Sequence, residues 1–156
     1  MTDDSDRMDR LRAEIDAVER SALRRVDPGA RAVVIAGAIM VLLVATSLPW
    51  VGGASGWEVL RGTADPADGV GLLPRLFAAV ALGFGVGLSA LALITRRWGL
   101  VWASALGCGY GVLDGVWAIW SRQTTAGAGP GAGLILAVLA VAVLAAQWFR
   151  LVVSRR

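Results

Sequence analysis

Residues 132–149 read AGLILAVLAVAVLAAQWF, a stretch without a single charged side chain. Three more apolar segments precede it: residues 32–50 (AVVIAGAIMVLLVATSLPW), 76–94 (LFAAVALGFGVGLSALALI) and 98–120 (WGLVWASALGCGYGVLDGVWAIW). A helix needs about 20 mostly apolar residues to cross ~30 Å of hydrocarbon, whereas a helix on the surface of a soluble protein keeps a polar face. The four segments therefore predict an all-α fold, an integral membrane four-helix bundle over residues 31–156.

The composition points the same way. Of 156 residues, 56% are hydrophobic and only 17% are charged, against about 25% charged in an ordinary soluble domain. The chain has no His and one Cys, Cys108, so the commonest zinc ligands and catalytic bases are missing and no internal disulfide can form. No catalytic, cofactor-binding or metal-binding constellation is recognisable, and the sequence predicts a protein that is not an enzyme.

All positive charges are arginines, and their distribution predicts an orientation. With the N-terminus in the cytoplasm, twelve arginines fall on that side and only Arg61, Arg75 and Arg122 on the other. Positive residues favour the cytoplasmic side of a membrane, so we expect a multi-pass protein of the bacterial inner (plasma) membrane with both termini cytoplasmic. Tryptophans near the segment ends, where indole rings favour the membrane–water interface, support the boundaries: Trp50, Trp98, Trp120 and Trp148.

Residues 1–30 predict an amphipathic cytoplasmic helix, the N-terminal arm. Its apolar stripe consists of Met8, Leu11, Ile15 and Val18, spaced three and four apart. The stripe could pack on the chain's own turns, dock on a partner or a second copy, or lie on a membrane surface; docking on a partner is favoured. Residues 1–31 carry seven Arg and eight Asp or Glu, a balance that disfavours nucleic acid as a partner.

Small residues recur every four positions in or beside three of the segments, most extensively in residues 98–120. Such seams let helices approach closely in lipid, where the hydrophobic effect does not drive association. They could serve packing within the bundle or docking against another subunit. The candidate interface residues are Gly99, Ala103, Gly107, Gly111 and Gly115, with Gly83 and Gly87.

Asp114 is the one acidic residue inside an apolar segment, and a charge there is costly. Arg75 and Arg122 are its candidate partners, through side chains long enough to reach it. The carboxyl could form a buried ion pair, stay protonated between helices, serve an ion-coupled substrate site, or pair with another subunit.

The segments RMDRLRAEIDAVER (residues 7–20), LPW (48–50) and SGWEVL (55–60) carry a resemblance. The chain resembles small actinobacterial four-span membrane proteins, among them the accessory subunit, called the lipid-uptake coordinator, of the mycobacterial mammalian-cell-entry (MCE) lipid transporters. This resemblance implies a subunit beside a permease or substrate-tunnel subunit, with a separate ATPase supplying energy.

Two functions remain open from the sequence. The first is a non-catalytic accessory or assembly subunit of an inner-membrane complex, a lipid importer in the sense of the resemblance, docking through the small-residue faces and the arm. The second is a small ion-coupled transporter that uses Asp114.

Overall fold

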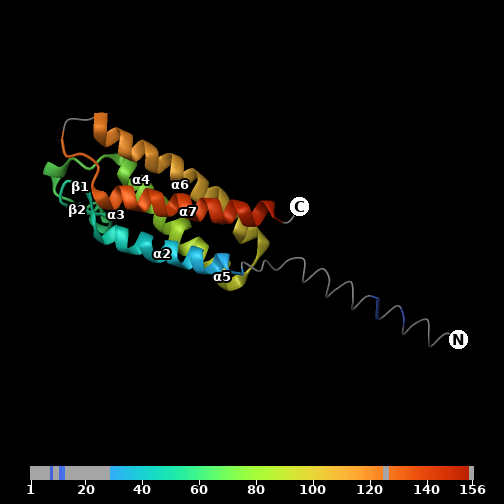
Figure 1. Ribbon diagram of the computed structural model, residues 1–156. Coiled ribbons are helices and arrows are strands. Elements are labelled where there is room, and N and C mark those ends of the chain that lie inside the picture. The colour runs from blue at the N-terminus through green and yellow to red at the C-terminus, as the bar shows by residue number, and fades with distance from the viewer. Residues whose placement is uncertain (1–7, 9–10, 13–28, 125–126, 155–156) are drawn as a thin grey trace.

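The computed structural model describes residues 8, 11–12, 29–124 and 127–154. Figure 1 shows a bundle of long helices with a small β-ribbon at one end. The elements in chain order are α2 (Arg31–Ser47), β1 (Pro49–Val51), β2 (Ala54–Ser55), α3 (Gly56–Arg61), the 3-10 turn η1 (Pro66–Asp68), α4 (Leu72–Val80), the π-helical stretch η2 (Ala81–Leu88), α5 (Ser89–Thr95), α6 (Trp98–Thr124) and α7 (Ala132–Val153).

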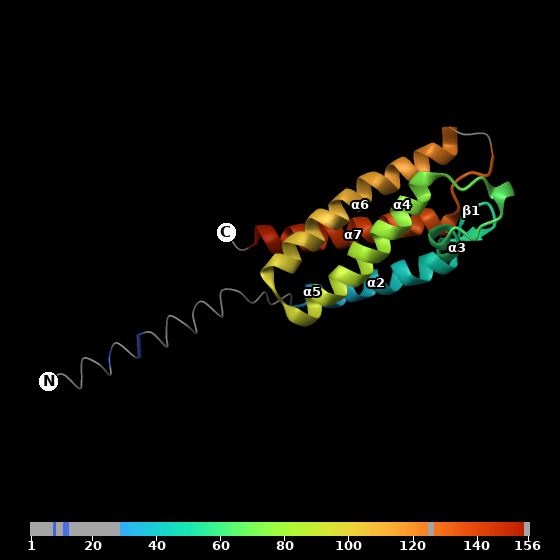
Figure 2. The same ribbon diagram turned by 180° about the vertical axis from the view of Figure 1, so that it is seen from behind.

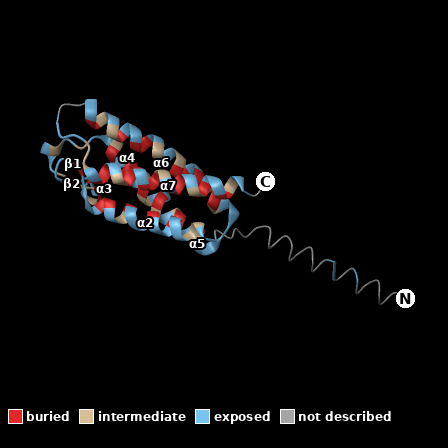
Figure 3. Cartoon of the chain, in the orientation of Figure 1, coloured by how far each residue is buried: buried red, intermediate tan, exposed pale blue. Residues whose placement is uncertain are grey.

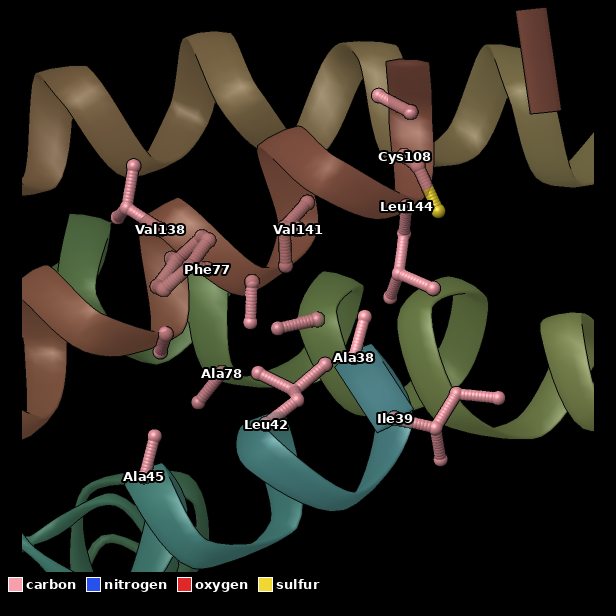
Figure 4. Packing of buried hydrophobic residues seen from close by; sticks show 14 of the residues in the cluster. Ala38, Ile39, Leu42, Ala45, Phe77, Ala78, Cys108, Val138, Val141 and Leu144 are labelled. Atoms are coloured by element: carbon pink, nitrogen blue, oxygen red, sulfur yellow. The ribbon is translucent and has the colours of Figure 1, made fainter. Parts of the chain in front are cut away.

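Helix α7 packs against both α6 and α2, and α4 and η2 pack against α6. Figures 1 and 2 show α7 running antiparallel to both of its neighbours. The buried core consists mainly of aliphatic side chains, with Phe77 and two tryptophans among them. Figure 4 shows Leu42 of α2, Phe77 of α4 and Val141 and Leu144 of α7 directed into this shared interior, and all four are at most 1% exposed.

One continuous helical rod, Leu72–Thr95, contains α4, η2 and α5. Its middle third is π-helical, a wider helix in which each N–H bonds to the carbonyl five residues back. This stretch contains three glycines, and the hydroxyl of Ser89, the residue after it, donates to the carbonyl of Phe84 at 2.9 Å. The rod ends at Arg96, which adopts the left-handed conformation (φ 52°) that turns the chain into α6.

The connector between α2 and α4 contains a two-stranded ribbon, the short helix α3 and the turn η1. Strands β1 and β2 pair antiparallel around Gly52, which has a positive φ of 58°. Ser55 and Glu58 form a reciprocal capping box at the start of α3. The backbone N–H and the hydroxyl of Ser55 both bond to the Glu58 carboxylate at 2.8 Å, and these bonds lower the pKa of Glu58.

Two of the four tryptophans expected at a membrane interface, Trp50 and Trp148, are instead buried. Trp50 is 0% exposed; its indole N–H donates to the carbonyl of Ala45 at 2.8 Å, and its ring centroid lies 5.4 Å from that of Phe77. The last residue before α7, Gly131, donates its N–H to the carbonyl of Trp50 at 2.7 Å. The ribbon and the α6–α7 loop therefore cover Trp50, and its indole fills this end of the core.

The outward faces of the helices are largely apolar, and Figure 3 shows exposed residues along all of them. Among the described residues, Leu72–Thr95, Trp98–Thr124 and Ala132–Val153 are long and apolar enough to cross a membrane, by length and composition alone. Between 33% and 50% of their most apolar stretches is buried within the bundle. α2, with 17 residues, is an apolar helix shorter than these three.

Most of the N-terminal arm lies outside the described residues, including Ile15 and Val18 of the predicted stripe. Met8 and Leu11 are helical, with 54% and 50% of their surfaces exposed. The docking role of the stripe therefore stays a prediction.

Candidate nucleic-acid interface

Four arginines gather at the end of the bundle opposite the ribbon, which we call the arginine end: Arg31, Arg96, Arg97 and Arg150. Arg31 begins α2, Arg96 and Arg97 form the turn between α5 and α6, and Arg150 lies in the last turn of α7. Figures 1 and 2 both show these helix ends side by side. A hydrogen bond of 3.4 Å from Nη1 of Arg31 to Oγ of Ser154 joins the start of α2 to the end of α7.

The two ends of the described bundle differ in their acidic residues: the ribbon end carries arginines and acids together, and the arginine end carries arginines without acids. Within residues 29–124 and 127–154 the acidic residues are Glu58, Asp65 and Asp68, in the connector at the ribbon end, and Asp114 inside α6. None of these four lies at the arginine end, where Arg97 and Arg150 are exposed. The described bundle therefore presents arginines at this end and its acidic residues elsewhere.

Helix dipoles largely cancel at this end. Both α2 and α6 begin there, but α5 and α7 end there, so the positive dipole ends of two helices are offset by the negative dipole ends of the other two. Arg31 is the first residue of α2, and Arg97 immediately precedes α6. A positive residue in the first turn is unfavourable for a helix on its own, and any attraction of this end for anionic groups such as phosphates comes from the arginine side chains.

The small-residue seam of α6 divides into packed and open positions. An added Cβ at Gly107 would collide with the ring of Phe84, and one at Gly111 would lie 3.1 Å from Cγ1 of Val141. An added Cβ at Gly115 would lie 2.6 Å from Cγ2 of Val138, whereas an added Cβ at Gly99 would meet no atom within 4 Å. Ala103 is half-buried, and Gly83 and Gly87 of η2 are exposed. The middle of the seam thus packs inside this chain, and its role toward another subunit stays a prediction.

Asp114 and Arg75 are not brought together by the structure. Asp114 is 1% exposed, and its Oδ2 atom has no hydrogen-bond partner among the described residues. Arg75 is exposed, and its guanidinium lies so close to Gly62 that a Cβ there would collide with it. With Asp65 and the backbone around η1, Arg75 lines a small pocket of about 170 Å³. Burial raises the pKa of Asp114.

We expect Asp114 to make the stability of the fold fall as pH rises. Because its folded-state pKa is above the ordinary value of 3.8, the folded protein holds the proton more tightly than the unfolded chain does. Its contribution is therefore complete below pH 3.8 and is lost as pH rises through the raised folded pKa. Denaturant unfolding at a series of pH values measures this slope.

The matched control for this measurement is Asp114→Asn, which keeps the shape and cannot ionise. The difference in unfolding free energy between the variant and the original chain should change as pH rises above 3.8, and the slope that the lowered pKa of Glu58 contributes cancels from this difference because both chains contain Glu58. A difference that is constant across this range would show that Asp114 ionises as freely in the folded state as in the unfolded chain.

A buried polar cluster joins three helices near the centre of the bundle. Nε1 of Trp148 in α7 donates to Oγ of Ser89 at 2.9 Å, and Oγ of Ser89 lies 3.9 Å from Sγ of Cys108 in α6. All three residues are at most 1% exposed. Burial raises the pKa of the Cys108 thiol to about 11, so at neutral pH this sulfur stays protonated and is a poor nucleophile.

Arg122 has a structural role that no motif in the sequence indicated. It is 5% exposed, and its guanidinium donates to the carbonyls of Gly69 at 2.9 Å and Ala128 at 2.8 Å. These bonds fasten the end of α6 to the connector and to the α6–α7 loop. Arg122 is thus turned toward backbone carbonyls and away from the partnership with Asp114 that its position suggested.

Comparison with known proteins gives a family for the chain. Residues 12–156 match the MiaB C-terminal domain. The chain is 48% identical over 155 residues to the tRNA-2-methylthio-N(6)-dimethylallyladenosine synthase of Mycobacterium avium (strain 104). The match covers 97% of this chain and 22% of that protein, so the chain spans less than a quarter of its relative's length. No solved structure matches the chain.

These findings overturn the predicted identity and function. The resemblance to an accessory subunit of an MCE lipid transporter is wrong, because both matches lead to a tRNA-modifying enzyme. The two predicted functions, a subunit of a lipid importer and an ion-coupled transporter that uses Asp114, are wrong for the same reason. The segments quoted for the resemblance are chemically unspecific, since helix-forming charged residues and a capping box occur in many families.

The predictions of solvent, location, partners and enzyme class also need correction. Apolar helices satisfy their own backbone hydrogen bonds in any environment, so the length and hydropathy of these helices do not establish an integral membrane bundle or a multi-pass plasma-membrane location. The relative is an enzyme that acts on tRNA, which contradicts the expectations of a non-enzyme and of no nucleic-acid partner. The match over nearly its whole length shows that the chain belongs to the MiaB C-terminal domain family.

Proposed function

We propose that this chain serves a tRNA-modifying enzyme as a domain that contacts tRNA, with the arginine end facing the phosphate backbone. The observation that carries the proposal is an end of the described bundle with arginines and no acidic residue: Arg31, Arg96, Arg97 and Arg150 lie there, and the acids of the described bundle lie elsewhere. Contacts from arginine to phosphate supply most sequence-independent affinity for nucleic acids and fix how a protein sits on them.

The relative's name specifies a methylthio group on an adenosine of tRNA, a product that requires transfer of sulfur to the base. The side chains described here supply little for that step. The single thiol, Cys108, is buried with a raised pKa, and among the described residues no three or more His, Cys, Asp or Glu gather where they could hold a metal ion. We therefore assign the sulfur transfer to other parts of such an enzyme and a role in binding tRNA to this domain.

A pair of charge-matched double variants tests the proposal. Arg97→Gln with Arg150→Gln removes two exposed charges from the arginine end, and Arg61→Gln with Arg75→Gln removes two from the ribbon end. For each phosphate that the protein no longer neutralises, the salt slope of binding should fall by roughly 0.7–0.9. We expect the first variant to bind fluorescently labelled tRNA about tenfold more weakly at moderate salt, with a slope reduced by about 1.5. Fluorescence anisotropy at several salt concentrations measures both quantities.

The ribbon-end variant should keep the affinity and the salt slope of the original chain, because its charges lie beside Glu58 and Asp65 at the opposite end. An equal loss in both variants would mean that net charge alone governs binding. Absence of tRNA binding by the unmodified chain would end the proposal.

A further inference from the structure

An exposed tryptophan follows two of these arginines in the chain. Trp98 is the first residue of α6 and follows Arg96 and Arg97 in the chain. Its side chain is 44% exposed. The ring of Trp102, one turn further along α6, meets it at a centroid distance of 5.7 Å and an interplanar angle of 72°, an edge-on contact. This contact braces the Trp98 indole from one side and leaves much of its surface open.

The charge around Trp98 distinguishes it from the other exposed tryptophans of α6. Trp117 and Trp120 are 52% and 62% exposed, but they line an apolar surface groove of about 370 Å³ with Leu73 near the ribbon end. Trp98 instead lies at the end where α2 and α6 begin and where Arg97 and Arg150 are exposed. An exposed aromatic side chain at the same end of the bundle as exposed arginines has the composition of sites that bind single-stranded nucleic acid, in which bases stack on rings while cations hold the phosphates.

We infer that Trp98 is a stacking platform for an unpaired base of RNA, with Arg97 holding the adjoining phosphate. The inference rests on the proposed function and adds to it a preference for single-stranded over paired RNA. Bases inside a duplex have no free face for the indole, whereas bases in loops and at ends can unstack onto it. Trp98 therefore selects the unpaired parts of a tRNA, while the arginines bind paired and unpaired backbone alike.

Substitution at Trp98 distinguishes the contribution of base stacking to RNA affinity from the contribution of the arginine charges. The probes are a short oligoadenylate and the same strand paired with its complement. Trp98→Ala should weaken binding of the single strand by about 5- to 150-fold, the range for removal of one base–aromatic stack. It should change duplex binding less than about twofold and leave the salt slope unchanged, because every arginine stays in place. Trp98→Phe keeps an aromatic face and should retain most of the affinity.

Trp120→Ala is the matched control, since it removes an even more exposed indole from the far end of the same helix. It should bind both probes as the original chain does, and an equal loss in Trp120→Ala would overturn the inference. Equal binding of the single strand by Trp98→Ala and the original chain, with the arginine-end variant still impaired, would overturn the inference and leave the proposed function standing. A loss of affinity for phosphatidylglycerol vesicles in Trp98→Ala, without a loss for RNA, would assign Trp98 to a lipid surface and also overturn it.

Discussion

Replacing Gly115 by leucine should destabilise the fold by about 3 kcal/mol, the upper range for overpacking a tight core. Even a Cβ at this position would lie 2.6 Å from Cγ2 of Val138 and 2.9 Å from Cε2 of Phe77. Phe77 is 0% exposed and Val138 is 7% exposed, so neither can swing into solvent to make room. α6 would have to move away from α4 and α7 together. Urea unfolding followed by circular dichroism measures the decrease in stability.

Gly99→Leu is the control for this prediction, because the same substitution is made in the same helix. A Cβ at Gly99 meets nothing within 4 Å, and leucine has a better helix propensity than glycine, so this variant should match the original chain or exceed its stability by up to about 1 kcal/mol. Equal stability of the two variants would show that helix α6 is not held at the spacing described. Gly107 is a less decisive site, since Phe84 is 40% exposed and its ring can turn outward.

Sequence and structure agree most closely where a single long element is concerned. The apolar run 132–149 lies wholly within α7, Ala132–Val153, because such a run contains no proline or turn signal to interrupt a helix. The run cannot indicate what surrounds it. Leu144 is buried by other helices, while Leu139 on the same helix is 58% exposed, and hydropathy gives both the same weight. An apolar run therefore predicts a helix, but it does not show whether protein, lipid or water surrounds that helix.

The arginines illustrate a second limit. Counting them by side predicted an orientation in a membrane, yet Arg97 and Arg150 support an electrostatic surface equally well, because phosphates of lipids and of RNA attract the same guanidinium groups. The near balance of charges in residues 1–31 argued against nucleic acid. That count averaged over one segment, whereas binding depends on where charges lie in space. Only the folded arrangement separates the arginine end from the acids of the connector.

Features that depend on partners far apart in the chain were beyond prediction. Trp50 has the position of an interfacial residue, but its burial requires the β-ribbon and the loop at Gly131 to close over it. The π-helical stretch has no established sequence signal other than its glycines. Ser89 and Trp148 are 59 residues apart, and nothing in the sequence pairs them.

The largest effect of a single polar side chain is expected from Arg122→Met, which should cost about 2–4 kcal/mol, since hydrogen bonds from a charged donor contribute about 1.5–3 kcal/mol each. Methionine fills much of the volume but leaves the carbonyls of Gly69 and Ala128 without their donor. These carbonyls belong to exposed residues, so water replaces part of the missing hydrogen bonding, which keeps the expected cost below the sum of the bonds. Chemical unfolding gives the global decrease in stability, and amide hydrogen exchange in the connector should rise more than exchange in α2.

Two further variants separate geometry from charge at this site. Arg122→Lys keeps the positive charge but lacks the planar fork that reaches both loops, so it should fall between the original chain and Arg122→Met. Arg61→Met removes an exposed arginine at the same end of the bundle and should change stability by less than about 0.5 kcal/mol. If Arg122→Met were as mild as Arg61→Met, the connector and the α6–α7 loop would be held by the β-ribbon and Trp50 without help from the guanidinium. A clear excess for Arg122→Met would instead show that this one side chain holds the ribbon end of the bundle together, independently of the charges at the arginine end.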